Sequence, residues 1–326
     1  MPATSTTETW DAAWTLTMRA HRKQLTDNIF DEYPTLAYMR KSGKVQLENG
    51  GKEIKEDLLY GTNASEWFDG YDTLNTDAVD GITAAFYPRR YIATPITISM
   101  TEETENKKSE NAEKLLTAKT EQSMSTARDT INAAIFSAQT GKSMLGFQDI
   151  IADTPTSGTV GGINRATNSW WRNQTQSIGD FDASSTPSYT GLKALGTLYN
   201  NCSEGNTQPD GVILSLTTFG QYEDILEGTG YARIEQRDGK GIGTQKSGNN
   251  LMFRNSEVWY DRDIASSRLY CLNSKFLKLS IERSLNFAKT PFKEPSNQLA
   301  KVAFIVVGIQ LVTHNARRLG VGTSVS

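Results

Sequence analysis

Between residues 101 and 140 the apolar side chains recur at the spacing of one helix face. Thr101 is followed by acidic residues that suit the positive end of a helix dipole, and neither proline nor glycine occurs before Gly141. At 1.5 Å per residue this helix would be a rod of roughly 60 Å. Its first third is polar all round, so we expect it to pack along only part of its length. The apolar face of the rest comprises Leu116, Met124, Ala127, Ile131, Ile135 and Ala138.

A second amphipathic pattern covers residues 8–30. Its apolar residues recur at roughly helical spacing and leave the opposite face polar. We expect a helix whose apolar stripe lies either on its own domain or on a neighbouring subunit. The stripe comprises Trp10, Trp14, Met18, Leu25 and Ile29.

Residues 43–98 predict a long two-stranded excursion with a wide polar tip. Asn49-Gly50-Gly51 separates two short runs, which is a strong signal for a hairpin turn. A hairpin alone in water is marginally stable, so contacts outside it must hold it. The tip is rich in Asp, Asn, Thr and Gly, and its isolated aromatic residues are Trp67, Phe68 and Tyr71.

The second strand of this excursion should not lie at the centre of a sheet. Residues 82–99 are rich in β-branched and aromatic residues, but Pro88 and Pro95 interrupt them. Proline lacks the backbone donor that a central strand needs, so it is tolerated only at edges or bulges.

The remainder of the chain predicts an α+β fold. A helix is expected over 188–202, and a buried strand from Val212 to Leu216 leads into a second helix. The glycine-rich, charged stretch 228–250 is typical of an exposed mobile loop. Residues 302–307 are apolar on both faces, so we expect this strand to be covered on both sides, with the long helix as one cover.

Composition excludes several classes of protein. The 326 residues are 37% hydrophobic and 22% charged, as in folded globular proteins, and the net charge of −3 argues against a protein that coats nucleic acid. Cys202 and Cys271 are too few to staple such a chain, which suggests a reducing compartment. The N-terminus does not resemble a signal peptide, and the longest apolar run, 302–312, is too short to span a bilayer. We therefore expect a soluble protein, cytoplasmic where it is made.

The sequence also lacks recognisable catalytic motifs. Its two histidines, His21 and His314, show no metal-ligand spacing. The Gly-Lys-Ser at 141–143 fails as a phosphate loop, because Phe136 stands where a glycine is needed. We therefore expect no catalytic site, no cofactor and no metal. The acid pair Asp261 and Asp263 is interpreted as a surface feature.

The segment 161–174, GGINRATNSWWRNQ, places two tryptophans side by side among amides and arginines. If the segment is extended, Trp170 and Trp171 face opposite ways, so only one of them can join a given core. The other would pack with Arg165 and Arg172 at a domain or subunit junction, since arginine is favoured at interfaces.

The order of these elements resembles the major capsid proteins of tailed bacteriophages, the Hong Kong 97 type of fold that encapsulin shells share. The resemblance covers essentially the whole chain. The segment GTVGGINRATNSWWRNQ is similar to the stretch that follows the spine helix in that family, and FIVVGIQLVTHNARRLGVGT is similar to its closing strands.

This resemblance implies a division of the chain and a function. Residues 1–40 would be the N-arm, 41–96 an extended loop that reaches onto the next subunit, 97–146 with 281–326 the peripheral domain, and 147–280 the axial domain. The chain would be a structural, non-enzymatic head protein in the virion, assembled in the host cytoplasm into pentamers and hexamers around double-stranded DNA without sequence-specific binding.

The resemblance also implies partners and leaves alternatives open. A separate scaffolding protein, a portal and a decoration protein are the expected partners, with no membrane. The alternatives are an encapsulin-like compartment, an uncharacterised hydrolase and another virion part. The candidate subunit-interface residues are Trp10, Trp14, Lys44, Lys52, Trp67, Phe68, Tyr71, Arg89, Arg90, Arg165, Trp171, Arg172, Arg237 and Lys240.

Overall fold

The structure is a computed structural model that describes residues 33–77, 79–105, 109–179, 181, 190–228, 251–296 and 298–325, without the side chains of 105, 109–114, 227 and 228. The expected helix over 8–30 and nearly all of the glycine-rich stretch 228–250 lie outside these residues.

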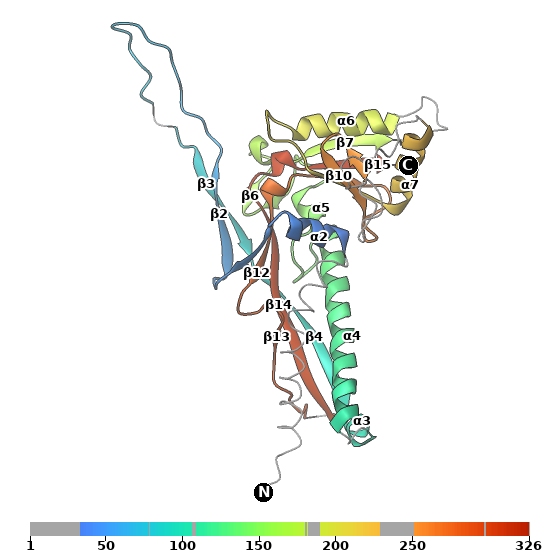
Figure 1. Cartoon of the computed structure of the whole chain (residues 1–326). Coiled ribbons are helices and arrows are strands. Elements are labelled where there is room, and N and C mark those ends of the chain that lie inside the picture. The colour runs from blue at the N-terminus through green and yellow to red at the C-terminus, as the bar shows by residue number, and fades with distance from the viewer. Residues whose placement is uncertain are drawn as a thin grey trace, which may run out of the picture.

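A five-stranded sheet organises the elongated half of the molecule (Figure 1). Its long strand β14, Ala300–Thr313, pairs antiparallel with β4, Arg90–Ser99, along one edge. The other edge of β14 pairs with β12, Leu277–Glu282, and with the short β13, Ala288–Lys289. Strand β1, Val45–Glu48, continues the sheet by pairing in parallel with β12. Because β4 bonds only to β14 in this sheet, the prediction that this segment does not lie at the centre of a sheet is confirmed.

Helices α3, Met100–Glu105, and α4, Ser109–Phe136, run along this sheet (Figure 1). The expected helix over 101–140 is therefore present as two described helices, and α4 ends at Phe136 rather than near Gly141. Short α5, Phe147–Ile150, follows close to this end, where the Gln148 side chain donates to the Phe136 carbonyl at 2.8 Å. The Asp149 carboxylate accepts from the Gln139 amide at 2.7 Å. These side chains take up backbone groups that another helical turn would have used.

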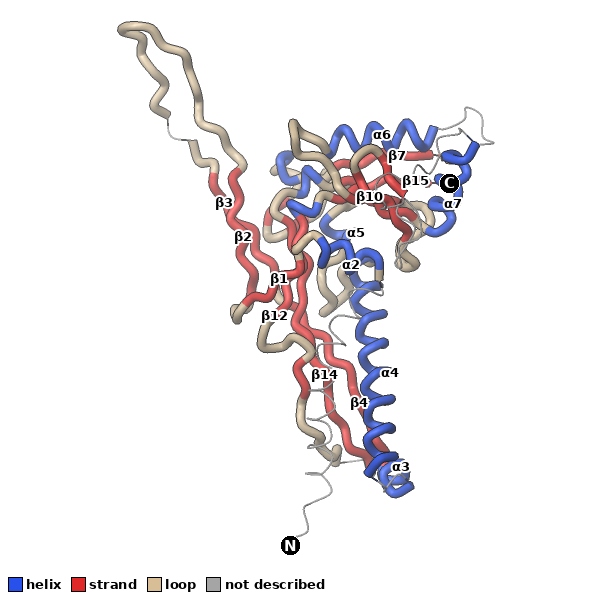
Figure 2. The backbone as a smooth tube through the Cα atoms, viewed as in Figure 1, coloured by secondary structure: helices blue, strands red, loops and turns tan. Residues whose placement is uncertain are grey.

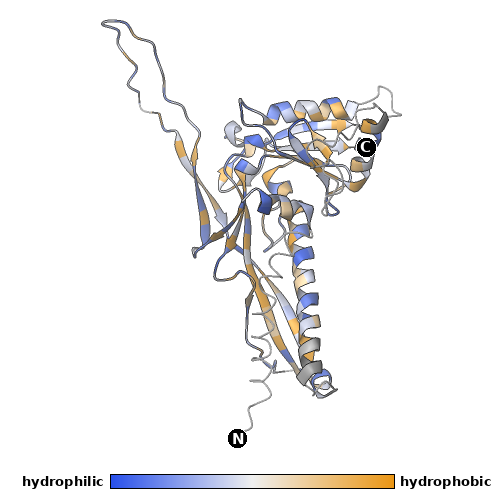
Figure 3. Cartoon of the chain, viewed as in Figure 1, coloured by the Kyte–Doolittle hydropathy of each residue, from blue (hydrophilic) through white to orange (hydrophobic). Residues whose placement is uncertain are grey.

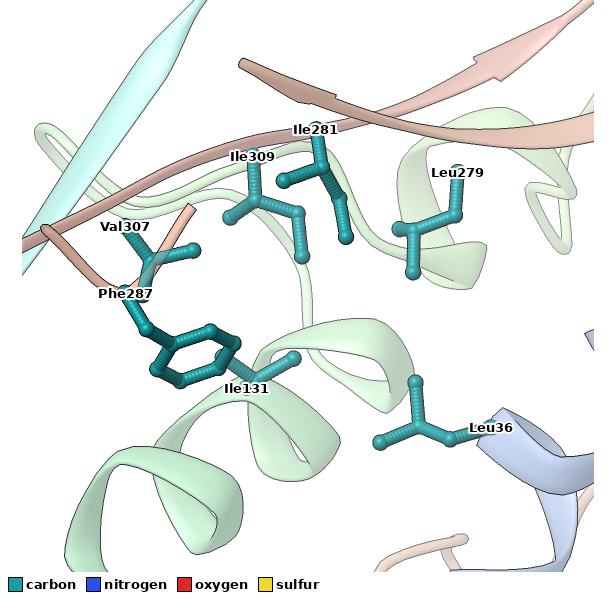
Figure 4. Close-up of a pocket in the computed structure, with 7 residues that line it drawn as sticks. All are labelled: Leu36, Ile131, Leu279, Ile281, Phe287, Val307 and Ile309. Carbon is teal, nitrogen blue, oxygen red and sulfur yellow. The ribbon is translucent and has the colours of Figure 1, made fainter. Parts of the chain in front are cut away.

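The predicted apolar stripe of α4 packs on one face of the sheet. The five members within the helix are all buried, whereas Ala138 lies beyond its end and is exposed. Figure 3 shows apolar residues concentrated in the sheet beside α4. Between helix α2, Pro34–Lys41, helix α4 and the sheet lies a cavity of about 10 Å³, room for one water at most (Figure 4). It is lined by Leu36, Ile131, Leu279, Ile281, Phe287, Val307 and Ile309.

The expectation that residues 302–307 are covered on both faces is wrong for this subunit. Ala303, Ile305 and Val307 are buried, but Phe304 on the opposite face remains 41% exposed, and its two neighbours on that face are only half-buried. The helices cover one side of this part of β14. Only the second half of the strand, from Val307 onward, is buried at every position.

The projecting hairpin consists of β2, Glu53–Leu59, and β3, Ile82–Pro88 (Figure 2). Residues 60–81 join these strands at the far end. The prediction that Asn49-Gly50-Gly51 closes a hairpin is wrong, because β1 before it pairs with β12 and β2 after it joins a separate sheet. The two glycines, with φ of +61° and +92°, turn the chain between the sheets instead.

A six-stranded sheet forms the other half of the molecule, in the order β7-β15-β11-β8-β10-β9. The expected helix over 188–202 is α6, Thr190–Cys202, and the expected buried strand with its helix is β8, Gly211–Leu214, followed by α7, Leu216–Gly228. The last strand of the chain, β15, belongs to this sheet, although the sequence analysis placed residues 281–326 in the peripheral domain. The domain boundaries themselves stay a prediction. The other strands are β7, Gln174–Gly179; β9, Leu251–Phe253; β10, Ser256–Tyr260; β11, Leu269–Leu272; and β15, Gly320–Val325.

Short elements complete the described chain. Helix α2, Pro34–Lys41, begins with proline at its first position and buries Leu36 and Met39 against the main core. Residues 33–40 of the expected N-arm thus pack within their own subunit. The remaining short elements are β5, Thr159–Val160; β6, Ile163–Asn164; and the single turns η1, Ser169–Trp171, η2, Ser274–Phe276, and η3, Ala316–Arg318.

We expect Ile135→Ala to lower the free energy of unfolding by about 2–5 kcal/mol, because truncating a fully buried isoleucine leaves a cavity. The matched control is Ser125→Ala, an exposed position on the same helix, which should change stability by less than about 0.5 kcal/mol. Urea denaturation followed by circular dichroism measures both. Equal effects of the two substitutions would contradict the packing of α4.

Candidate assembly surface

The tip of the hairpin is the most exposed apolar feature among the described residues. Trp67 and Tyr71 are fully exposed, at 102% and 106%, and Phe68 is 68% exposed. Large aromatic side chains in water at one site indicate a surface that binds another molecule. The same tip carries five carboxylates, and no lysine or arginine occurs between Lys55 and Arg89. The acidic residues are Glu66, Asp69, Asp72, Asp77 and Asp80.

Close backbone contacts define the neck of the hairpin, just beyond β2 and β3. The Tyr60 amide donates to the Gly81 carbonyl at 2.8 Å. A Cβ atom on Gly61 would lie 2.7 Å from the Gly81 Cα, so glycine is required for the two chains to approach this closely. The Tyr60 ring stacks on Trp170, with centroids 4.7 Å apart and planes inclined by 12°. The neck therefore rests on the segment that precedes β7.

The inner face of the hairpin packs against the same segment. The buried Tyr87 donates its hydroxyl to the Thr313 carbonyl at 2.9 Å. The Phe86 amide donates to the Gly161 carbonyl at 2.9 Å, and a Cβ on Gly161 would lie 2.8 Å from that of Ala85. The hairpin is thus fixed at its base while its tip stands free of this packing.

Charged side chains surround the base of the hairpin. Lys278 on β12 contacts Glu48 and Glu56, each at 2.6 Å. Arg89, just after β3, contacts Glu48 at 3.1 Å and Glu282 at 2.7 Å. These pairs join β1, β2 and β12.

Burial alone would raise the pKa of Glu56, but hydrogen bonds from His314 and Lys278 outweigh it and lower this pKa below its ordinary value. Burial likewise opposes the charge on Lys278, yet its hydrogen bonds to Glu48 and Glu56 raise its pKa. The pKa of Glu282 is lowered, first because its carboxylate accepts a hydrogen bond from the Gly50 amide. These three groups are therefore charged at neutral pH.

The paired tryptophans lie in the single turn η1, so the expectation of an extended segment is wrong. The two rings are nonetheless divided between two environments. Trp171 is 1% exposed and donates its indole N–H to the Val160 carbonyl at 3.1 Å, whereas Trp170 is half-buried under Tyr60.

The two arginines of this segment bind its own backbone. Buried Arg165 donates to the Ile150 carbonyl, and burial lowers the pKa of its guanidinium. Arg172 donates to the carbonyls of Arg165 and Ala166, each at 2.7 Å. Both side chains therefore shape the segment within one subunit.

The structure distributes the predicted interface residues over three environments. Lys52, Trp67, Phe68 and Tyr71 are exposed; Lys44, Arg90 and Arg172 are half-buried; Arg89, Arg165 and Trp171 are buried among residues of their own subunit. Trp10, Trp14, Arg237 and Lys240 lie outside the described residues. Sequence reasoning missed the contacts of Tyr60, Lys278, Glu282 and His314, because no local pattern signals partners that lie about a hundred or more residues away.

The described residues offer little for catalysis. Both cysteines are free and buried, and burial raises the pKa of Cys202 to about 12 and that of Cys271 well above its usual range, so neither thiol is reactive. Within the ranges given above, no group of three or more metal-ligating side chains could hold a metal ion. Over the same part of the chain, no helix has both the length and the apolar character needed to cross a membrane.

Comparison with solved structures identifies the architecture. The chain aligns with the capsid asymmetric unit of cyanophage A-1(L) at a TM-score of 0.66 and 13% identity, over 89% of this chain and 92% of the other. It aligns with the capsid of the native GTA particle at 0.60 and 12%, over 89% and 90%. The chain has the fold of tailed-phage capsid proteins, the Hong Kong 97 type.

Two further structures share this capsid fold at lower scores. They are the satellite phage P4 procapsid with its size-determination protein, at a TM-score of 0.53 and 12% identity over 94% and 91% of the chains, and the SrpI encapsulin complex of Synechococcus elongatus, at 0.53 and 7% over 88% and 88%. No protein-family model matches the sequence. No curated protein matches it either. The predicted α+β capsid fold is thus confirmed by structure, at identities too low for sequence comparison.

Trp171→Ala should lower the free energy of unfolding by about 3–5 kcal/mol, because it empties a fully buried site and removes the bond to Val160. Trp170→Ala is the matched control: it loses mainly one ring stack and should cost about 0.5–1.5 kcal/mol. Urea denaturation distinguishes the two. Equal losses would show that the two rings do not occupy different environments.

Proposed function

We propose that this chain is a major capsid protein, the repeating subunit of an icosahedral shell that encloses a phage genome. The fold supports this proposal, because the cyanophage and GTA capsid structures align with about nine-tenths of the chain. The subunit is structural rather than enzymatic. As a capsid component it belongs to the virion, assembled in the host cytoplasm.

The observation that carries the proposal is the hairpin tip. The tip carries exposed aromatic residues, and Figure 2 shows the loop beyond β2 and β3 standing away from the rest of the subunit, so a second copy is the natural source of the missing contacts. A contact between two different surfaces of the same protein, repeated by rotation, closes into rings, and pentamers and hexamers are such rings. Lys52, Trp67, Phe68 and Tyr71 are therefore the strongest interface candidates, with Lys44, Arg90 and Arg172 nearer the body of the subunit.

The charge of the chain suits a container rather than a nucleic-acid binder. Tight binding to phosphates requires a basic excess, whereas the net charge here is −3. The proposal is that double-stranded DNA is enclosed without sequence-specific contacts. A scaffolding protein, a portal and a decoration protein complete the proposed assembly, and the P4 procapsid is an example of this fold found with a further protein.

An encapsulin-like compartment is the second candidate, because the SrpI encapsulin shares the fold at a TM-score of 0.53. The cyanophage and GTA capsids align with higher scores, which favours the capsid. The two functions differ in their contents, namely genomic DNA or a protein cargo.

We expect the expressed chain to form closed icosahedral particles, seen by negative-stain electron microscopy. Scaffolding protein or host lysate is supplied where needed. Particles isolated from infected or induced cells should contain phage DNA. Shells that carry only protein cargo would support the encapsulin alternative. A chain that stays monomeric under all of these conditions would refute both shell functions.

Replacement of residues 62–80 by Asn-Gly should leave a folded subunit that no longer assembles. The replacement keeps β1, β2, β3 and the neck, and Gly61 and Gly81 are already close enough for a short turn. Particle yield by electron microscopy and stability by urea denaturation are measured together. The matched control is Asn63→Ala with Thr73→Ala, two exposed tip positions outside the aromatic cluster, which should assemble normally. Normal assembly of the shortened chain would contradict the role of the tip.

A further inference from the structure

The five-stranded sheet has two chemically different faces where the hairpin crosses it. Leu279 and Ile281 on β12 line the apolar cavity beside α2 and α4. The alternating residues Lys278, Ser280 and Glu282 point the other way, and Lys278 contacts Glu56 on the hairpin. All of them are buried, so the hairpin base lies on a buried polar layer.

This polar layer is incompletely hydrogen-bonded among the described residues. Ser280 and Gln310 are register partners, 1% and 0% exposed, and the hydroxyl of one and both amide atoms of the other lack hydrogen-bond partners. Ion pairs and hydrogen bonds at the margin of this layer, from Lys278 and His314 to Glu56, join it to the hairpin.

One of these contacts involves a histidine. His314, directly after β14, places its Nδ1 2.9 Å from a carboxylate oxygen of Glu56. Histidine is the side chain that ordinarily titrates near pH 6.5. With a neutral imidazole the contact is a hydrogen bond to the ionised Glu56 carboxylate. With an imidazolium the same contact also gains the attraction between two opposite charges.

The summed charge of the surrounding side chains predicts whether a proton on His314 strengthens or weakens the contact. Glu48, Glu56 and Glu282 carry three negative charges, and Arg89 and Lys278 carry two positive charges. The cluster has one negative charge in excess while His314 is neutral. Protonation of His314 brings the count to zero.

We propose that His314 and Glu56 form a proton-operated clamp, which holds the base of the hairpin against the body of the subunit more tightly at pH 5.5 than at pH 8. The clamp is a property of the folded chain. Its use in controlling how the hairpin is presented to a second copy rests on the proposed shell function.

The charged groups on the surrounding elements support this assignment. Lys275, in the turn that accepts the His314 backbone hydrogen bond, directs its ammonium over the Phe276 ring at 5.6 Å. Arg318, further along the chain, pairs with Glu204, and Arg317 is exposed. On the hairpin side, Tyr87 bonds to the Thr313 carbonyl. Glu56 is thus the carboxylate in contact with His314 among the described residues.

The carboxylates set the acid limit of the clamp. Because the pKa of Glu56 is lowered in the folded chain, its contribution is complete above the ordinary value of 4.5 and is lost as the pH falls through the lowered value. The pKa of Lys278 is raised, so its charge persists through the whole range. The carboxylate and ammonium groups of the clamp are therefore charged at both pH 5.5 and pH 8.

Hydrogen exchange at the Phe86 amide tests the clamp directly, because this amide joins the hairpin to Gly161 on the body of the subunit. In unassembled full-length chain, its protection factor, corrected for the intrinsic pH dependence of exchange, should be about three- to tenfold higher at pH 5.5 than at pH 8. The Leu279 amide, bonded to the Lys44 carbonyl within the sheet, serves as an internal reference and should change much less.

Substitutions assign the effect to the pair. His314→Gln and Glu56→Gln should each abolish the pH response, and the double variant should respond no differently from either single one. His21→Gln removes the other histidine of the chain and should retain the full response. His314→Lys carries its charge at both pH values, so protection should become independent of pH even if the glutamine variants fold poorly.

Equal Phe86 protection at both pH values in the unsubstituted chain, or a full response in His314→Gln, would overturn the clamp. Assembly is scored separately by electron microscopy. If shells form but the protection factor of the Phe86 amide is the same at pH 5.5 and pH 8, the clamp is refuted and the shell function stands. A pH-dependent profile in a chain that never assembles would refute the shell function and leave the clamp intact.

Discussion

Backbone hydrogen bonding along β14 is the constraint on which the rest of the structure depends. A 14-residue strand presents donors and acceptors on both edges, and burying them without partners would be costly. β4 satisfies one edge from Ala300 to Ile309, and β12 with β13 satisfies much of the other. This pairing brings residues 90–99 and residues 277–313 into one sheet. The same strand leads through η3 into β15, and so joins this sheet to the six-stranded one.

The hairpin depends on that sheet without belonging to it. β2 and β3 pair only with each other in the described chain, and a two-stranded ribbon is marginal by itself. Tyr87, Gly161 and the stacked Tyr60 and Trp170 fix its base, while ion pairs tie it to β1 and β12. The hairpin is therefore fixed at its base and carries exposed aromatic residues at its tip. This geometry suits a subunit that is complete only when it contacts another copy.

Periodic patterns predicted the elements well wherever one face of an element is buried by the chain itself. The stripe from Leu116 to Ile135 packs as expected, α6 and α7 form where their apolar residues recur, and Pro95 lies on an edge strand. Errors arose where a local signal had two possible partners. Asn49-Gly50-Gly51 turns the chain as its glycines require, but β1 pairs in parallel with a strand more than 200 residues away. Residues 302–307 have the apolar pattern of a strand buried on both faces. In the single subunit, however, the face that carries Phe304 remains exposed.

By itself, the sequence determined the α+β class, the long helix with its one-sided packing, the polar excursion and the absence of a recognisable catalytic motif, because composition and periodicity depend on each residue and its near neighbours. Only the tertiary structure decided that Trp171 is buried while Trp170 supports the hairpin, and that His314 meets Glu56 across 258 positions of the chain. Such contacts are set by how strands from distant segments align in one sheet. That alignment is a collective result of backbone pairing along β14 and leaves no local pattern in the residues that it brings together.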